Sequence, residues 1–367
     1  MTEPWTRDAA VLAGDQHSLS PLQSWLLFQS LYRPEPAAFV EQMTCLLAGD
    51  LDAGLFDRAW QSAVDRQPAL RTAFTWEDVE EPVRIVSSGL SSPKTSAAVD
   101  HQEEAGETPV KLETWLAAER QRGFDLSRAP LVRALLIDVS NETAERRFRL
   151  IVTGHLLVIG GADLARLAGE ALEIYAGLRE GRQPRLAAAR LDQGEPQTPD
   201  FESAETFWRD GLRGFTESLV LPSERREAGE GTGWQQMTVA APAARHGLSL
   251  DTMAQGAWAL LLGRWTGRSE ALFGVAGAGG TATPARAALP AAAEVATWLH
   301  GLQARQAAAR AFEQVLPPHL QAWSELPPGT ELFEVLYSFH GFAALPAAGG
   351  LEVIEPRVLP RGGFPLS

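Results

Sequence analysis

His155 is the residue of this chain that is best placed to do chemistry. It follows an alternating apolar run over residues 148–152, a pattern typical of a β-strand with one buried face. After residues 156–159 the chain reaches Gly160 and Gly161, where a helical pattern begins. A histidine at such a junction can exchange a proton near neutral pH, and the glycines let a ligand approach the backbone. The alternative is a hydrogen-bonded histidine that only packs at a boundary between two lobes.

Other kinds of site find little support in the sequence. None of the seven histidines lies at zinc-helix spacing with a third ligand nearby, and no Gly-x-Ser-x-Gly or phosphate-binding loop motif is present. The glycine-rich run 274–280 does not fit dinucleotide spacing, and the acidic run 77–81 is typical of a solvated surface. The single cysteine, Cys45, lies in an apolar run and predicts a buried strand residue.

Bulk composition limits the class of protein. The chain has 367 residues, of which 45% are hydrophobic and 21% charged, so it is long enough for two domains and too apolar to be wholly disordered. Its net charge of -14 argues against binding to phosphate backbones and is compatible with small-molecule or protein partners. Residues 1–15 lack the features of a secretory signal, and no apolar stretch approaches the ~20 residues of a membrane span, so we expect a cytoplasmic protein.

The elements that would position His155 alternate between strands and helices. Ser20, Pro21 and Gln23 match a helix start with a capping box. Helices are expected over 21–31, 51–64, 112–122, 162–179, 202–212, 249–265 and 292–311, and strands over 38–47, 70–76, 82–86, 131–139, 147–152, near 219, and over 235–239, 271–275 and 331–339. Residues 87–108 are predicted to be a loop, and 351–366 extended at best. The pattern predicts an α/β chain in two lobes.

Several segments together resemble one family, the condensation domains of nonribosomal peptide synthetases, which are relatives of chloramphenicol acetyltransferase. The resemblance extends from about residue 17 to the end of the chain, and its segments occur in the family's order. They are residues 19–23 with 27–32, 66–74, 124–133, 255–262 and 326–334.

The resemblance implies two chloramphenicol-acetyltransferase-like lobes in a V arrangement with a central cleft or tunnel. The expected domains are a flexible tail over 1–16, an N-terminal lobe over 17–182, a linker over 183–203 and a shortened C-terminal lobe over 204–367. The partners implied are peptidyl or acyl carrier proteins, which present substrates on phosphopantetheine arms. The domain itself would bind no cofactor or metal, and an acceptor amine would attack the donor thioester to form an amide.

The central motif of that family, His-His-x-x-x-Asp-Gly, is altered here. The matching stretch begins with Gly154 and His155 and ends with Ile159 and Gly160, so the second histidine is kept while the first histidine and the aspartate are absent. The resemblance implies that the aspartate is structural and pairs with an arginine, whose matching position lies in 278–280, where there is none. Because both members of the ion pair are missing together, the fold could tolerate the change.

The resemblance also assigns roles to the neighbours of His155. Gly154, Ile159, Gly160 and Gly161 would line the cleft that admits the pantetheine arm. The start of the helix after Gly161 could stabilise negative charge on the thioester oxygen. Arg71 and Arg133 would support the site structurally.

Three further departures concern the second lobe. Polar residues 193–198 stand where the family has an aromatic-rich motif, the segment 281–293 looks shortened, and the chain stops at 363–367 before further strands. We therefore expect a more open tunnel and an incomplete second sheet.

Three functions follow from this sequence. The first is an acyl or aminoacyl transferase, in which His155 points into the cleft and orients or deprotonates the attacking amine. The second is a catalytically inactive module that recruits carrier proteins or a tailoring enzyme. The third is a structural remnant of a degraded synthetase.

Overall fold

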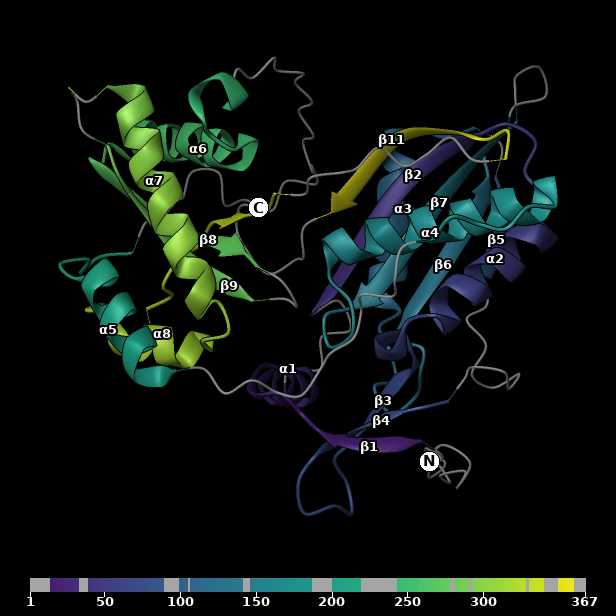
Figure 1. The fold of residues 1–367 in the computed structure, drawn as a ribbon, viewed down its shortest axis with the longest axis horizontal. Coiled ribbons are helices and arrows are strands. Elements are labelled where there is room, and N and C mark those ends of the chain that lie inside the picture. Colours follow the sequence, from purple (N-terminus) through teal and green to yellow (C-terminus); the bar gives the residue numbers. More distant parts are fainter. Residues whose placement is uncertain are drawn as a thin grey trace. The chain divides into compact units, whose positions relative to one another are not determined.

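The computed structural model of the chain describes residues 14–32, 39–88, 99–104, 106–140, 146–186, 200–218, 243–277, 281–289, 292, 294–327, 330–339 and 349–359. The chain divides into two compact units (Figure 1). The first comprises Met1–Gln197 and His340–Gly362, and the second Thr198–Phe339 and Gly363–Ser367. The division after Gln197 falls inside the segment 183–203 that is expected to be the linker.

The first unit is built on a five-stranded sheet with the order β11-β2-β7-β6-β5. Its strands are β11 (Glu352–Leu359), β2 (Val40–Ala48), β7 (Arg147–His155), β6 (Val132–Asp138) and β5 (Val99–Glu103). All neighbours are antiparallel except β5 and β6, which are parallel. Figure 1 shows β11, in yellow, beside β2, in purple, although these two strands come from opposite ends of the chain.

Helices cover both faces of this sheet. The helix α4 (Gly161–Glu180) packs against α2 (Ala53–Asp65) and against β2, β7 and β11. The helix α3 (Pro109–Gln121) shares an apolar cluster with Ile151 of β7. Gly154 instead faces Leu164 of α4. Since side chains alternate along a strand, positions 151 and 154 lie on opposite faces, so α3 and α4 cover opposite faces of the sheet.

Several local predictions are confirmed. The helix α1 (Pro21–Tyr32) begins with the expected capping box, in which Gln23 N donates to Ser20 Oγ at 3.1 Å and Ser20 N donates to Gln23 Oε1 at 3.1 Å. Cys45 is fully buried in β2, as expected. The mixed α/β class is confirmed as well.

A small second sheet of the first unit differs from expectation. Its order is β1-β4-β3, with β1 (Asp15–Ser18) antiparallel to β4 (Val83–Val86), which also pairs with β3 (Thr72–Thr75). The flexible tail predicted over residues 1–16 is therefore wrong for Asp15 and Gln16, because their backbone pairs with β4. The strand predicted over 70–76 begins as the 3₁₀ turn η2 (Pro68–Arg71). The predicted loop 87–108 contains β5, a polar edge strand with little apolar signal.

The second unit contains a three-stranded sheet with the order β10-β8-β9. Its elements are α5 (Phe201–Leu212), η4 (Ala243–His246), α6 (Leu250–Thr266), β8 (Glu270–Ala276), β9 (Ala282–Ala288), α7 (Val295–Ala309), η6 (Arg310–Phe312), α8 (Pro317–Trp323) and β10 (Leu336–Tyr337). The strand β9 and the helix α8 were not predicted. The segments 193–198, 278–280 and 363–367 and the strands expected near 219 and over 235–239 lie outside the described residues.

The closing part of the chain corrects the expected domain boundaries. Residues 204–367 were all expected in the C-terminal lobe, whereas β11 pairs with β2 in the first unit. The cause is long-range backbone pairing, which local sequence patterns do not report. No helix in the described part of the chain is both long and apolar enough to cross a membrane.

Candidate functional site

The loop that follows β7 begins with a tight turn around His155. The backbone N–H of His155 donates to Leu131 O at 3.0 Å, which ties the end of β7 to the chain just before β6. The carbonyl of His155 accepts hydrogen bonds from Val158 N at 3.0 Å and from Ile159 N at 3.1 Å. The turn thus places residues 156–160 in one compact loop between the end of β7, at His155, and the start of α4, at Gly161.

The imidazole of His155 is buried and electrically neutral at ordinary pH. Only 4% of the residue is exposed, and burial lowers its pKa to about 4, because a charged ring would lose its hydration. The Nδ1 atom accepts a hydrogen bond from Leu157 N at 3.2 Å. Because a neutral imidazole has a single N–H, this contact leaves the proton on Nε2. In the part of the chain that is described, no residue accepts a hydrogen bond from Nε2.

Phe124 and Arg133 lie next to this imidazole. The ring of Phe124 meets His155 edge to face, with centroids 6.2 Å apart and an interplanar angle of 83°. The guanidinium of Arg133 lies over the Phe124 ring at 4.3 Å, a cation–π contact. Arg133 pairs with Thr153 in the sheet register, and positions 133, 153 and 155 share the face that α3 covers.

Arg133 is also held by a buried carboxylate. Its Nε donates to Glu119 Oε2 at 2.7 Å, and Nη1 donates to Gly123 O at 2.6 Å. Glu119 belongs to α3 and is buried. These bonds fix the guanidinium against Phe124, so Arg133 lies where it can support the position of the His155 ring.

Arg71 lies elsewhere. Its Nη1 donates to Ser87 O, and Ser87 N donates back to Arg71 O at 3.0 Å. These contacts join η2 to the residue after β4 in the small sheet. The structure therefore brings Arg133 together with His155 through Phe124, and it gives Arg71 a separate structural place.

Gly154 and Ile159 fit one another closely on the opposite face of the sheet. A Cβ atom at position 154 would collide with Ile159 Cγ2 and would lie 2.9 Å from Leu164 Cδ2. Ile159 is only 2% exposed. The apolar side chain at 159 thus fills the space that any side chain at 154 would need, so the two departures from the family motif depend on each other.

The start of α4 is occupied by a carboxylate of the protein itself. Gly160 is the N-cap and provides no side-chain cap, and Glu41 Oε2 accepts the hydrogen bond from Gly161 N instead. Glu41 lies on β2 opposite Gly154. A carboxylate at this position uses the N–H and the positive end of the helix dipole. It also opposes a second negative charge there, so this helix start is poorly suited to the oxyanion role that the sequence suggested.

Sequence reasoning missed two residues of this site. Glu41 is the one charged residue of β2, near the start of the strand, and that charge was the only local signal. Phe124 belongs to the segment 124–133 that resembles the family, but nothing in its spacing indicated contact with His155. Both contacts join parts of the chain that are distant in the sequence.

Comparison with known proteins identifies the family of this chain and its relatives in sequence. The family model for the condensation domain matches residues 14–288. The chain is 32% identical to one protein of the linear gramicidin synthase of Brevibacillus parabrevis, over 89% of this chain and 4% of that protein. It is 31% identical to another protein of the same synthase, over 91% of this chain and 7% of that protein. The chain therefore spans only a small part of the length of these relatives.

Solved structures agree on the fold. A mutant of the starter condensation domain of rhizomide synthetase, in complex with C8-CoA and Leu-SNAC, matches with a TM-score of 0.73 and 16% identity, over 95% of this chain and 83% of that one. The first condensation domain of the CDA synthetase also gives a TM-score of 0.73, with 18% identity, over 94% of this chain and 87% of that one. The expected relation to this α/β fold is confirmed, while the V arrangement and the central cleft stay predictions.

Proposed function

Because this chain belongs to the condensation domain family, we propose that it transfers an acyl or aminoacyl group from a phosphopantetheine thioester to an acceptor amine. Condensation domains work with the carrier proteins of nonribosomal peptide synthetases and form amide bonds between carrier-bound substrates. In this proposal the phosphopantetheine arms belong to the partner carriers, and the domain holds no cofactor of its own. A cytoplasmic location stays a prediction.

The observation that best supports transfer is the protonation state of His155. Leu157 N holds Nδ1, and the proton on Nε2 has no acceptor among the described residues. To act as a base, Nε2 would have to release this proton to Nδ1, and Nδ1 would have to give up its contact with Leu157 N. The geometry therefore favours a hydrogen-bond donor over a proton acceptor.

The reaction can be written for such a donor. The amine nitrogen attacks the thioester carbon, and negative charge develops on the carbonyl oxygen. His155 Nε2–H donates to that oxygen, an interaction that is strong in a buried site with little water. The C–N bond forms, the C–S bond breaks, and the proton lost by the amine is taken up by the departing sulfur. His155 orients and stabilises the reacting group and ends the cycle in its starting state.

A second candidate is a catalytically inactive module that recruits carrier proteins or a tailoring enzyme. The apolar contact between Ile159 and Gly154 and the carboxylate of Glu41 at the start of α4 favour it. Two of these residues, Gly154 and Ile159, depart from the family motif around His155. Carrier binding needs only a docking surface, and it would tolerate these two changes.

A condensation assay separates the two candidates. Both carrier proteins are loaded with substrates, and product transfer is read by intact-protein mass spectrometry for the wild type and for His155→Ala. We expect transfer to fall about 100-fold or more in the variant, because one oxyanion donor contributes on that order. His101→Ala is the matched control, since His101 is an exposed histidine of the same unit, paired with Asp57.

The controls decide how the result is interpreted. Thermal unfolding must show that His155→Ala remains folded, because the truncation leaves a cavity beside Phe124. Equal loss in His101→Ala would remove His155 from the mechanism. Carrier binding without transfer in any protein, unchanged by either substitution, would establish the recruiting module instead.

A further inference from the structure

Gln23 makes a second contact besides the capping box of α1. Its side chain lies in the first turn of that helix and is buried, with 7% of the residue exposed. The Oε1 atom accepts the hydrogen bond from Ser20 N at 3.1 Å. The Nε2 atom donates to Leu157 O at 3.4 Å, across 134 positions of the sequence. A single amide thus joins the start of α1 to the loop that follows His155.

Leu157, which receives this hydrogen bond, lies directly beside the imidazole. Its backbone N–H donates to His155 Nδ1 at 3.2 Å, and this contact leaves the imidazole proton on Nε2. The carbonyl of Leu157 belongs to the same peptide unit as Val158 N, which donates to His155 O at 3.0 Å. The backbone that Gln23 holds is therefore bonded to His155 both at the ring and at the carbonyl.

The peptide between Leu157 and Val158 is restrained by its contact with Gln23. Because a peptide unit is planar, a rotation that takes Leu157 O away from Gln23 also takes Val158 N away from the carbonyl of His155. A donor at the peptide oxygen also polarises the unit and strengthens the hydrogen bond from its N–H. Leu157 is only 1% exposed, so little water is available to replace these contacts. Gln23 thus limits the movement of the backbone that holds Nδ1.

We propose that Gln23 is a positioning residue of the transfer reaction, which acts through Leu157 and keeps the proton of His155 on Nε2. The inference rests on the proposed function, in which Nε2–H donates to the thioester oxygen. A loosened Leu157 N–H would allow the ring to rotate and its proton to move to Nδ1, so the donor would be misdirected or lost. An error of this kind slows the reaction of the bound substrate and leaves its binding intact.

The capping box provides a matched control for this role. Ser20 Oγ accepts from Gln23 N at 3.1 Å, and Ser20→Ala removes that bond but leaves the side chain that donates to Leu157 O. Gln23→Met keeps the length of the side chain and removes its amide. Each change removes one of two reciprocal capping bonds, so both should lower the midpoint of thermal unfolding by about 2–4 °C. Gln23→Glu is a second variant, whose carboxylate can accept from Ser20 N but has no N–H for Leu157 O.

Kinetics and NMR on the full chain test the proposal together. In the condensation assay with both carriers loaded, we expect kcat to fall about tenfold in Gln23→Met and Gln23→Glu with KM nearly unchanged, and to stay within about twofold in Ser20→Ala. In NMR spectra of the chain with isotope-labelled histidine, the signals of His155 are assigned by their absence from His155→Ala. Wild type and Ser20→Ala should carry the proton on Nε2 alone, whereas both variants of Gln23 should shift toward a mixture of the two tautomers.

The two measurements separate this proposal from the proposed function. Equal falls in kcat for Gln23→Met and Ser20→Ala, or a tautomer of His155 that the variants of Gln23 leave unchanged, would overturn the positioning role. If no protein transfers product, the transferase fails, and the tautomer alone then decides whether Gln23 controls the ring. Transfer that persists in His155→Ala would remove His155 from the mechanism and Gln23 with it. A fall in kcat confined to the variants of Gln23, together with the change of tautomer, supports the proposal.

Discussion

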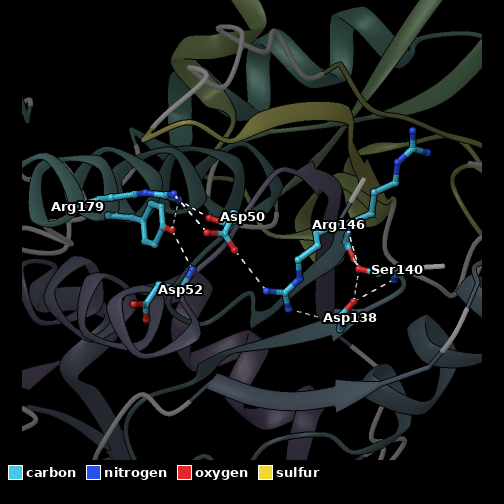
Figure 2. A network of polar contacts seen from close by, with 8 residues as sticks. Asp50, Asp52, Asp138, Ser140, Arg146 and Arg179 are labelled. Atoms are coloured by element: carbon cyan, nitrogen blue, oxygen red, sulfur yellow. Dashed lines mark hydrogen bonds and ion pairs between the residues drawn. The ribbon is translucent and has the colours of Figure 1, made fainter. Parts of the chain in front are cut away.

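The two ends of the five-stranded sheet differ in the side chains that lie there, with a buried apolar contact at one end and a network of ion pairs at the other. At the end where β7 finishes, His155 and Ile159 are 4% and 2% exposed, and an apolar contact stands where the family motif has an aspartate. At the other end, charged residues gather near the surface, and Asp50 and Arg146 among them are exposed. Figure 2 shows that network: Arg146 meets Asp50 at 3.4 Å and Asp138 at 3.1 Å, and Arg179 lies 3.7 Å from Asp50.

This difference in exposure predicts how much a substitution at each end should change the stability of the fold. The side chains of Asp50 and Arg146 are 77% and 53% exposed, so water screens their attraction and would solvate either one alone. At the buried end, a charge without a partner has no such alternative. Losing both members of an ion pair is tolerable there, whereas restoring one is costly. Substitutions at the two ends should therefore differ strongly in their effects.

The largest effect is expected from Ile159→Asp. This change restores the aspartate of the family motif but places it in a buried site lined by Gly154 and Leu164. We expect a loss of about 3 kcal/mol or more in the free energy of unfolding, measured by urea denaturation. Ile159→Val, which removes one methyl group, should cost about 1 kcal/mol. Similar losses in the two variants would mean that an acid at 159 finds a partner.

The second effect concerns pH. Burial lowers the pKa of His155 in the folded chain to about 4, below its ordinary value of 6.5. Between these values the unfolded chain binds a proton that the folded chain does not, so stability falls as pH drops from 6.5 toward 4. The loss amounts to about 3 kcal/mol across this window. Urea denaturation at several pH values, with His155→Gln as the reference, isolates the contribution, and parallel curves for the two proteins would contradict it.

The third effect is that of Gly154→Ala. The added methyl group would collide with Ile159 and crowd Leu164, and we expect a loss of about 1–3 kcal/mol from overpacking. Removal of the Ile159 side chain beyond Cβ should relieve part of the strain. In a double-mutant cycle with Ile159→Ala, the cost of Gly154→Ala should therefore shrink. Strictly additive losses would show that the two positions do not depend on each other.

The smallest effect is expected at the exposed end. Arg146→Gln removes the contacts with both Asp50 and Asp138, yet the midpoint of thermal unfolding should shift by less than about 2 °C, because exposed ion pairs contribute little. Raising the salt concentration should shrink even this shift. A loss comparable to that of Gly154→Ala would erase the proposed contrast between the two ends of the sheet.

Local patterns predicted much of the first unit. The capping box of Ser20 and Gln23 set the start of α1, and the alternation of apolar residues identified β7. The apolar stripe predicted α4, whose residues Leu164, Leu167, Ala171 and Tyr175 are buried. These features succeed because hydrogen bonding and periodicity act between residues a few positions apart.

What the sequence by itself determined is thus the type and order of most elements, the family, and the place of His155 at the end of a strand. Only the tertiary structure decided that β11 joins β2, that Glu41 meets Gly161, and that Phe124 lies between Arg133 and His155. The physical reason is that these contacts join distant parts of the chain. Whether they form depends on sheet register and on which face each side chain takes, and neither is set by neighbours in the sequence.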